Sequence, residues 1–532
     1  MISKVVIHGY RKFRQFAITP DPTTNIIVGD NETGKSTLLE AITLALSGRI
    51  DGRWANEELN PYWFNADAVR DYLDAYAKDS QVPAPTICIE LYFDSLDSDV
   101  QRMRGVHNSL RLDFPGTKLE VVLNPDYDEE FAAYMADPDR PDVLPTEYFE
   151  ALWKDFNDMP LRRRPTALGL SVIDSRTIRS KAGVDYHTRE ILSSFLEPKE
   201  RAAISVAHRK SRYELTSSAL KGLNEKVREG SEKLHDAPLG LTMDQSARAS
   251  WEAGVVPAVD DIPFAMSGQG QQASIKVALA MKRRAESART VLIEEPETHL
   301  AYSRLHKLID RVETLAGESQ QLFVTTHSSF VLNRLGLNKL ICLRGDDPTR
   351  ISDLDDGTVS YFKHLSGYDT LRLALATRLV LVEGPSDEMI FKRGYFDRFQ
   401  KSPESDGIDV ISMNGITFKR ALELCARLDR DVVALQDNDG SPVSEILQEL
   451  TEHMSDIRRM FVGDPSLGKT LEPQLITANG VEHMRTVLGL RKQDNPETWM
   501  PNHKTEGALR ILESQEAVVM PNYIKQAIEH FA

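Results

Sequence analysis

The sequence predicts an α/β protein made of two successive units, each built around a largely parallel sheet. The evidence is a set of short apolar runs that alternate with helical patterns, which is typical of such sheets. One run, at 25–28, leads into a glycine-rich loop and a helix, and runs at 291–293 and 322–324 follow in the same unit. Two later runs, at 379–382 and 432–435, end in carboxylates. We therefore expect a phosphate-loop unit followed by a unit with acidic strand ends.

Length and composition limit the class of protein. A chain of 532 residues is too long for one hydrophobic core, and its 41% apolar and 27% charged residues are those of a globular protein. No apolar run reaches the roughly 18 residues of a membrane-spanning helix. Its three cysteines, Cys88, Cys342 and Cys425, lack disulfide or zinc spacing. We expect a cytoplasmic protein without a membrane partner. The net charge of −16 argues against a general nucleic-acid coat.

The glycine-rich loop at 29–36 fits the pattern G-x-x-x-x-G-K-[ST] between a strand and a helix. Glycines allow backbone amides to wrap phosphate groups, a lysine reaches the β- and γ-phosphates, and a serine coordinates Mg²⁺. The sequence therefore predicts an ATP site with one Mg²⁺, in which Ser36 is the metal ligand. The loop residues expected to bind ATP are Gly29, Asn31, Gly34, Lys35, Ser36 and Thr37.

Two later strands supply the residues expected to hydrolyse ATP. The run at 291–293 ends in Glu294 and Glu295, of which the first would join the metal shell and the second would act on the attacking water. The next strand leads to His327, which would lie near the γ-phosphate. A histidine at such a place can also be purely structural, but its order after the acids favours the functional interpretation.

The stretch "FAMSGQGQQASIKVALAM" lies just before the acidic strand, and its Ser267-Gly268-Gln-Gly turn opens a helix. It resembles the signature segment of ATP-binding-cassette (ABC) ATPases, although it departs from Leu-Ser-Gly-Gly-Gln. In that family the signature of one copy closes over the ATP of another. The resemblance implies that Ser267 and Gly268 contact ATP and that the protein is a homodimer or higher oligomer. The order of motifs is similar to the heads of repair and SMC-like ATPases.

The segment at about 105–250 carries none of these motifs and is expected to be a helical insertion in the ATPase part. Within it, Leu220, Leu223, Val227 and Leu234 recur near helical spacing. This stripe predicts either one amphipathic helix packed on its own domain or a dimer-forming insertion. Both alternatives stay open.

The acidic strand ends of the second unit predict a metal site. Glu383 ends one strand, Asp387 follows the turn, and Asp437 and Asp439 end a later strand. Because the carboxyl ends of parallel strands lie along one edge of a sheet, these four acids are expected to converge. Convergent carboxylates repel one another unless divalent cations neutralise them, and oxygen ligands without Cys or His favour Mg²⁺ or Mn²⁺. Two such ions can activate water and stabilise the leaving oxygen in phosphodiester hydrolysis.

A Glu on one strand end and Asp-x-Asp on a later one resemble the Toprim fold. A cassette ATPase followed by Toprim resembles the overcoming lysogenization defect (OLD) family of nucleases, which includes the Gabija nuclease subunit and retron-associated effectors. The resemblance spans an ATPase part at about 1–370 and a Toprim part at about 371–532. It implies metal-dependent cleavage of a DNA substrate, regulation by ATP, assembly through the ATPase part, and a role in antiphage defence.

The family's functional residues carry over to matching positions of this sequence. Glu383, Asp387, Asp437 and Asp439 would bind two Mg²⁺ or Mn²⁺ ions, with Glu383 also counted as catalytic. A late lysine assists the transition state in these nucleases, and Lys504 is the first candidate, with Lys469 as the alternative. Glu472 would be an added metal ligand.

Two other functions are compatible with the sequence. The protein could be a non-nucleolytic DNA-repair ATPase, SMC- or RecF-like or clamp-loading-like, in which the Toprim acids are structural. It could also be a toxin component regulated by a helicase or by a retron complex of RNA and reverse transcriptase. A DNA-nicking assay on the purified protein distinguishes the nuclease from the first alternative. Co-purification of a partner tests the second.

Overall fold

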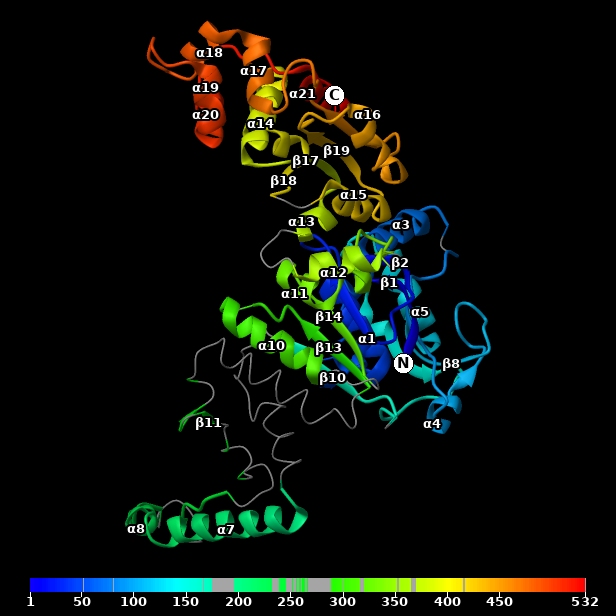
Figure 1. The fold of residues 1–532 in the computed structure, drawn as a ribbon. Helices are drawn as coiled ribbons and strands as arrows, with labels where there is room; N and C mark the ends of the chain where they lie inside the picture. The colour runs from blue at the N-terminus through cyan, green and yellow to red at the C-terminus, as the bar shows by residue number, and fades with distance from the viewer. Residues whose placement is uncertain are drawn as a thin grey trace. The chain divides into compact units, whose positions relative to one another are not determined.

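The structure is a computed structural model of the 532-residue chain (Figure 1). It divides into two compact units, each formed by three segments of the chain. Unit 1 comprises Met1–Val5, Leu39–Pro61 and Thr86–Thr325, and unit 2 comprises Val6–Leu38, Tyr62–Pro85 and Thr326–Ala532. The structure describes all residues except 51, 80, 166, 175–195, 232–238, 245–250, 252–254, 256–257, 260, 264–265, 267–288, 299, 316–319, 352–353, 365–369, 415–416 and 532.

An antiparallel sheet in unit 1 is built around β8 (Phe114–Leu123), which pairs with β6 (Ile87–Phe93) and β9 (Phe149–Asp155) on its two sides. The short β7 (Arg104–Gly105) also pairs with β8. In register, Leu119 lies opposite Ile89 on one neighbour and Trp153 on the other, and all three are buried. Cross-strand apolar neighbours of this kind stabilise a sheet through one buried face.

Three parallel strands of unit 1 surround the acids predicted for ATP hydrolysis, which lie at the end of the middle strand. They are β10 (Leu170–Asp174), β13 (Thr290–Glu294) and β14 (Gln321–Thr325). Their register aligns Asp174, Glu294 and Thr325 at the carboxyl ends. Helix α10 (Tyr302–Leu315) follows β13 and buries Leu305, Leu308, Ile309 and Val312, at the spacing of one helical face.

The segment at about 105–250, expected to be a helical insertion, contains strands as well as helices. Strands β8 and β9 extend the sheet of β6, and α5 (Asp128–Ala136) follows β8. The helical part lies later, in α7 (Pro198–Ser217) and α8 (Lys221–Ser231). The strands escaped prediction because they are stabilised by pairing with distant parts of the chain, β8 with β6 and β9 with β8, and their sequences carry no motif.

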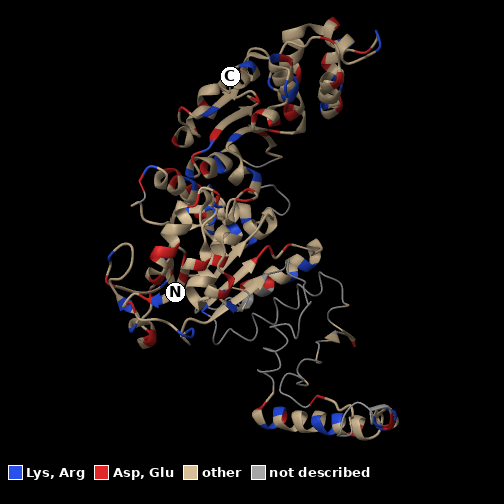
Figure 2. Ribbon diagram, turned by 180° about the vertical axis from the view of Figure 1, so that it is seen from behind, with Lys and Arg blue, Asp and Glu red and all other residues tan. Residues whose placement is uncertain are grey.

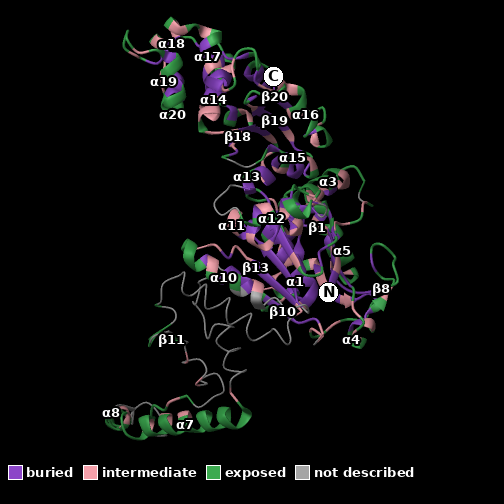
Figure 3. Cartoon of the chain, in the orientation of Figure 1, coloured by how far each residue is buried: buried purple, intermediate pink, exposed green. Residues whose placement is uncertain are grey.

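Helices α7 and α8 are exposed, as Figure 3 shows in green. Of the predicted apolar stripe, Leu223 is exposed, Leu220 and Val227 are half-buried, and Leu234 lies outside the described residues. Helix α7 has no buried residue and carries five Lys or Arg against two Glu, visible as blue bands in Figure 2. A dimer-forming role for this segment stays a prediction.

The phosphate loop belongs to unit 2, where β3 (Thr24–Val28) pairs in parallel with β15 (Leu340–Cys342). Helix α1 (Lys35–Ser47) begins inside the predicted motif, at its lysine. Strand β15 pairs on its other side with β16 (Thr349–Arg350), which is antiparallel to it. The strand–loop–helix context expected for a phosphate loop is therefore present.

The acidic strand ends belong to a four-stranded parallel sheet, also in unit 2, with the order β18-β17-β19-β20. Its strands are β17 (Arg378–Val382), β18 (Ile408–Ser412), β19 (Asp431–Gln436) and β20 (Arg458–Val462). Alternate residues of β17 enter different hydrophobic clusters, with Leu379 and Leu381 on one face and Val380 and Val382 on the other. Burial on both faces explains the continuous apolar runs in the sequence.

Helices on both faces of this sheet complete the Toprim part. They are α13 (Thr370–Leu375), α14 (Pro385–Phe399), α15 (Phe418–Arg427), α16 (Val443–Gln448), α17 (Leu471–Asn479), α18 (Val481–Val487), α19 (Pro496–Asn502), α20 (Lys504–Glu513) and α21 (Asn522–His530). The other elements include β1 (Ile2–Tyr10), β2 (Phe13–Ile18), α3 (Ala66–Tyr76), α11 (Ser329–Leu335) and α12 (Asp356–His364). No helix among the described residues is long and apolar enough to span a membrane.

Candidate functional site

The phosphate loop is curled around the ammonium group of Lys35. This side chain is only 7% exposed, and its Nζ donates hydrogen bonds to the carbonyl oxygens of Gly29 and Asp30, both at 2.8 Å. Phosphate oxygens of a nucleotide can replace these two carbonyls as acceptors, which is the role expected of the motif lysine. The arrangement fits a nucleotide, because the cation already lies inside the loop.

Two glycines leave the space that the loop needs. A Cβ atom at Gly29 would lie 2.4 Å from Thr33 Oγ1, and one at Gly34 would lie 2.7 Å from the Phe13 ring. Gly34 also has a φ of +100°, which side chains other than glycine rarely adopt. The two positions therefore require glycine for steric reasons. Thr33 closes the turn by donating through Oγ1 to the Asp30 carbonyl at 2.9 Å.

The paired acids of β13 lie at a strained turn. Glu294 is the last residue of the strand, and Glu295 follows it with a φ of +42°. The Glu295 N–H donates to the backbone oxygen of Thr325 at 3.0 Å, and its carboxylate accepts from Thr298 Oγ1 at 3.3 Å. Positive φ at a non-glycine residue costs energy and is enriched at functional sites. The turn holds the second acid just beyond the strand end, where a general base is expected.

His327 and the phosphate loop share one cavity in unit 2. Thr326 donates its N–H to the backbone oxygen of Ile27 in β3 at 3.2 Å, which places the start of the following loop beside the phosphate-loop strand. His327 and Asp30 both line a cavity of about 550 Å³. The role of His327 as a γ-phosphate sensor stays a prediction. Ser267 and Gly268, the expected signature residues, lie outside the described residues.

The acidic strand ends of the Toprim sheet meet at one edge. Val382 and Leu435 are paired in register, so Glu383 and Asp437 lie just beyond adjacent strands. The Asp437 N–H donates to Glu383 Oε1 at 2.8 Å. Asp387 lies in the first turn of α14 and accepts from the Gly384 N–H at 3.2 Å. The structure therefore brings Glu383 and Asp437 into contact, with Asp387 at the same edge.

Burial of these carboxylates and repulsion from neighbouring acids raise the pKa of all three. Burial comes first in each case, and it raises the pKa of Glu383 to about 7, that of Asp387 to about 6 and that of Asp437 to about 8. Charge repulsion adds to burial: Asp387 and Asp439 act on Glu383, while Asp387 and Glu383 act on Asp437. Glu472 raises the pKa of Asp387 in the same way. A cluster of this kind becomes favourably ionised when a divalent cation is present.

Lys504 faces the acids, and Lys469 lies at the Asp439 turn. Lys504 Nζ is 3.6 Å from Oε1 of Glu472, a buried acid in the first turn of α17 whose other oxygen accepts from Thr470 Oγ1 at 2.7 Å. The Lys504 charge also lowers the pKa of Glu383 and of Asp387. Lys469 instead contacts this turn through its backbone, because its carbonyl oxygen accepts a hydrogen bond from the Asp439 N–H at 3.1 Å.

The turn that follows β19 is held by Asn438, which the sequence analysis did not single out. Asn438 is fully buried, and its Nδ2 donates to the carbonyl oxygens of Gly463 and Gly468 at 3.2 and 2.7 Å. Its Oδ1 accepts from the Gly440 N–H at 2.8 Å. Asp439 takes a φ of +48° at this turn. The Asp-Asn-Asp-Gly sequence signals such a turn, since Asn and Asp bond to nearby backbone groups.

The donor set of the acidic edge fits a hard divalent cation. Among the described residues, no three Asp, Glu, His or Cys side chains are grouped so as to hold a metal ion as they stand. However, Asp437 Oδ1 is buried and has no hydrogen-bond partner among those residues, while Oδ2 accepts from the Leu471 N–H at 3.2 Å. Carboxylate oxygens without nitrogen or sulfur are the ligands that Mg²⁺ and Mn²⁺ prefer.

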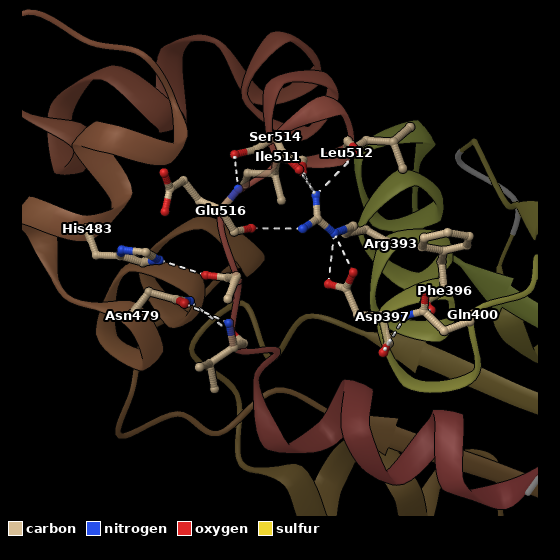
Figure 4. Close-up of polar contacts among 12 residues, drawn as sticks. Arg393, Phe396, Asp397, Gln400, Asn479, His483, Ile511, Leu512, Ser514 and Glu516 are labelled. Carbon is tan, nitrogen blue, oxygen red and sulfur yellow. Dashed lines mark hydrogen bonds and ion pairs between the residues drawn. The ribbon is translucent and has the colours of Figure 1, made fainter.

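A buried arginine joins the helix of Asp387 to the helix of Lys504 (Figure 4). Arg393 of α14 makes two contacts with Asp397, at 2.9 and 2.8 Å. Its remaining nitrogens donate to backbone carbonyls at and beyond the end of α20. The acceptors are Ile511 at 2.7 Å, Leu512 at 3.4 Å, Ser514 at 2.6 Å and Glu516 at 2.8 Å. These bonds cap the C-terminus of α20 and fix it against α14.

The chain after α20 is also bound by the helix of Glu472 and by the next helix. Asn479, at the end of α17, donates to the Val519 carbonyl at 2.8 Å and accepts the Val519 N–H at 2.7 Å. His483 of α18 contacts the Ala517 carbonyl at 2.7 Å. We call the segment Ser514–Val519 the strap. Through Arg393 and Asn479, the strap links the three helices that carry Asp387, Glu472 and Lys504.

Three family models match the sequence. An AAA domain matches residues 4–95, and a second AAA model, whose description also names the AbiEii toxin of a Type IV TA system, matches 185–333. The TOPRIM domain of overcoming lysogenization defect protein-like sequences matches 375–439. None of the curated proteins matches the chain.

Several solved structures resemble the chain at low identity. An SMC head bound to the C-winged helix domain of ScpA has 14% identity and a TM-score of 0.36, covering 67% of this chain and 98% of its own. The SMC head domain from Thermotoga maritima has 14% identity and a TM-score of 0.29, with coverage of 66% and 99%. The RecF–ATP recombination mediator has 13% identity and a TM-score of 0.33, with coverage of 65% and 96%. Structural similarity at these sequence identities and TM-scores does not assign a function.

The family models agree with the geometry. The AAA matches cover the phosphate loop and the strands of Glu294 and Thr325, while the TOPRIM match covers Glu383, Asp387, Asp437 and Asp439. The predicted fold class, a P-loop ATPase head followed by a Toprim domain, is thus confirmed. The pairing supports an OLD-type nuclease with an ATPase part. The chain therefore combines matches to AAA ATPase domains with a match to the TOPRIM domain of overcoming lysogenization defect protein-like sequences.

Proposed function

We propose that this protein is an ATP-regulated, divalent-metal-dependent DNA endonuclease. The observation that carries the proposal is the acidic edge of the Toprim sheet, where the Asp437 N–H donates to Glu383 Oε1 at 2.8 Å and the charge of Asp387 raises the pKa of both Glu383 and Asp437. Carboxylates held at such raised pKa values are costly to ionise without a cation. A purely structural role for these acids would not explain why the fold carries the energetic cost of ionising them.

Each residue at the edge has a role in this proposal. Glu383, Asp387, Asp437 and Asp439 hold the cations, and Glu472 is a further ligand or orients Lys504. Bound Mg²⁺ or Mn²⁺ would supply Lewis-acid activation of water and neutralise charge on the phosphate. Lys504 is favoured over Lys469 because its ammonium group lies 3.6 Å from Glu472 and lowers the pKa of Glu383 and of Asp387. From there it neutralises negative charge that develops on the scissile phosphate.

The ATPase part has separate roles. Lys35 binds the β- and γ-phosphates, and Ser36 binds the magnesium ion of ATP. The other loop residues shape the loop or lie on the helix that follows it: Gly29, Asn31, Gly34 and Thr37. Glu294 joins that metal shell, Glu295 takes a proton from the attacking water, and His327 contacts the γ-phosphate. Ser267 and Gly268 contact the nucleotide of a second copy, so the active assembly is a homodimer or larger. The role in antiphage defence, and any helicase or retron partner, rest on the family resemblance.

A plasmid-nicking assay tests the proposal directly. The purified chain is incubated with supercoiled DNA and Mg²⁺, Mn²⁺ or Ca²⁺, each with and without ATP. We expect nicking with Mg²⁺ or Mn²⁺ and a change in rate when ATP is added. The absence of nicking with all three ions, in both nucleotide conditions, would remove the nuclease function and leave the ATPase alone.

A further inference from the structure

Two stacked aromatic rings lie beside the lysine that faces the acidic edge, and the functions described above do not use them. Trp499 of α19 and His503, the residue before α20, have ring centroids 4.5 Å apart and ring planes only 6° from parallel. His503 Nδ1 also contacts the Trp499 carbonyl at 2.9 Å. Lys504, the proposed catalytic lysine, is the next residue in the chain. The stack is therefore attached directly to a residue of the proposed nuclease site.

The tryptophan of this stack is held in place by the fold. Trp499 is half-buried and packs against the hydrophobic cluster of the Toprim part, and the Arg510 guanidinium lies 4.9 Å from its ring centroid. Arg510 is itself fixed, because it donates to Glu506 at 2.9 Å and to the Leu488 carbonyl at 2.8 Å. The tryptophan ring therefore has little freedom to turn, and it sets the plane of the histidine ring that stacks on it.

His503 is the outer ring of the stack. It is exposed, and in the described part of the chain Trp499 is the ring that stacks on it. A planar ring has two faces, so the face opposite Trp499 is left without an aromatic neighbour among the described residues. Unpaired nucleobases stack on rings of this kind, because every base has a π-face. We call the exposed face of His503 the base platform.

The base platform lies on helices that pack against those of the acidic edge. Helix α19 packs against α17, which carries Glu472, and α20 packs against α14, which carries Asp387. Lys504 Nζ lies 3.6 Å from Glu472 Oε1, and consecutive Cα atoms are only about 3.8 Å apart, so His503 borders the site. A DNA strand with one phosphate at the acids therefore passes close to this ring.

The acidity of the chain favours a contact of this type with DNA. A net charge of −16 opposes general binding of phosphate groups to the surface. Stacking adds affinity for nucleic acid without requiring positive charge. A base can meet a side-chain ring only after it leaves its own stack, as it does in single-stranded or locally opened DNA. The chemistry of the base platform therefore points to an unpaired nucleobase.

We propose that His503 binds an unpaired nucleobase next to the phosphodiester that is cleaved, by stacking on it with the face opposite Trp499. This inference rests on the proposed nuclease function, since it assigns a substrate contact to the same site. His503 is a positioning residue in this scheme, and the cations and Lys504 act on the phosphate. DNA with an unpaired segment should therefore bind more tightly than a continuous duplex.

Oligonucleotides that carry 2-aminopurine report this contact without any cleavage, because the fluorescence of this base falls when it stacks on a ring. The base analogue is placed in turn at each position of a single-stranded segment, and binding is followed in Ca²⁺. We expect quenching with the parent protein at one or more positions and its loss in His503→Ala. Quenching should return in His503→Tyr, which keeps a ring. His503→Lys keeps a positive charge without a ring, so it should behave as His503→Ala.

His364→Ala is the matched control. His364 is an exposed histidine at the end of α12, and its Nδ1 contacts the carbonyl of Ser360 at 2.7 Å, but no described ring stacks on it. Affinity for the oligonucleotide should fall by roughly 5- to 100-fold in His503→Ala and should not change in His364→Ala. The loss should be similar at low and high salt, because stacking is not screened by ions. In nicking assays it should appear mainly in KM, and less in kcat.

The outcomes separate this inference from the nuclease proposal. If the parent quenches 2-aminopurine and His503→Ala does not, but no ion supports nicking, the nuclease proposal fails and the base platform stands. If the parent nicks DNA and His503→Ala keeps parental quenching and affinity, the base platform is overturned and the nuclease stands. Recovery in His503→Lys equal to that in His503→Tyr also overturns it, because charge then accounts for the contact. A loss that His503→Tyr does not restore overturns it as well, since the stack is then purely structural.

Discussion

The phosphate loop and the acidic edge have the same local architecture and opposite electrostatics. Each follows a buried parallel strand, β3 or β17, and each leads into a helix, α1 or α14. In the first, the charge of Lys35 is satisfied by the loop's own carbonyls at 2.8 Å. In the second, the carboxylates raise one another's pKa, and Asp437 Oδ1 is unpaired among the described residues. The same strand–loop–helix connection therefore gives two different sites. The charge of the phosphate loop is compensated without its ligand, whereas the negative charge of the acidic edge is not.

This difference indicates which ligand each site depends on most. A nucleotide replaces hydrogen bonds that Lys35 already makes, so its binding is an exchange of acceptors. A divalent cation at the acidic edge relieves repulsion that nothing else in the described part of the chain relieves fully, since Lys504 supplies a single charge. We therefore expect the acidic edge to respond more strongly than the phosphate loop to removal of its ligand or of one of its residues.

The largest effect is expected for Glu383→Ala. Removing this carboxylate takes away a proposed cation ligand and the acceptor of the Asp437 N–H, so DNA nicking should fall by at least about 10³-fold, or about 4 kcal/mol. ATP hydrolysis should persist. Glu388→Ala is the matched control, because this neighbouring acid is bound instead by Lys392 and Ser412 at 2.8 and 2.9 Å. Nicking at the parental rate by Glu383→Ala, with contaminating nuclease excluded, would show that the acidic edge is not catalytic.

Glu295→Gln is expected to have the next largest effect, on ATP hydrolysis. The amide cannot take a proton from water, so steady-state hydrolysis should fall by about 10²-fold or more while ATP still binds. Phosphate release and nucleotide titration measure the two properties separately. Hydrolysis at the parental rate would shift the assignment of the base to Glu294.

Lys35→Ala tests the phosphate loop, the site whose charge is compensated without its ligand. The ammonium group is the cation of the phosphate loop, and a charged hydrogen-bond donor contributes about 1.5–3 kcal/mol, so ATP affinity should fall by roughly 10- to 100-fold. Mn²⁺ binding at the acidic edge should not change, because the substitution lies outside the Toprim sheet. A nucleotide titration that gives the parental Kd would contradict the assignment of Lys35.

The smallest effect is a pH dependence of stability in the metal-free protein. The folded pKa values of Asp387, Glu383 and Asp437, about 6, 7 and 8, lie above the ordinary values near 4. The stability they contribute is therefore present at low pH and is lost as the pH rises from about 4 through about 8. We expect Tm to fall by several degrees, about 5 °C, over this window and to become flatter with saturating Mg²⁺ or in Asp437→Asn. An increase in Tm with pH would contradict the raised pKa values.

The sequence predicted the features whose residues are close together in the chain. The phosphate loop is contiguous, and its glycines lie where the structure leaves no space for a Cβ. The contact of Glu383 with Asp437 could also be expected, because parallel strands align their ends and each strand carries its own acid. In contrast, strands β8 and β9 depend on distant pairing, and the segment that contains them was expected to be helical.

The residues that the sequence did not reveal act across long separations. Asn479 binds both backbone groups of Val519, 40 residues later in the chain. Arg393 binds carbonyl groups more than 110 residues away, which no local pattern encodes. Asparagines and arginines of this kind are indistinguishable in sequence from ordinary surface residues until the helices are placed.

The strap carries a consequence for how this region can vary between related proteins. Arg393 and His483 contact strap residues through backbone carbonyls, and Asn479 pairs with both backbone groups of Val519. Every amino acid supplies those groups, so the exposed side chains of the strap can vary without loosening the helices of Asp387, Glu472 and Lys504, whereas Val518 is buried in the hydrophobic cluster. An insertion or deletion, however, would move the carbonyls out of reach of fixed side chains. The segment should therefore tolerate substitution at its exposed positions, but not a polar residue at Val518, while keeping a constant length.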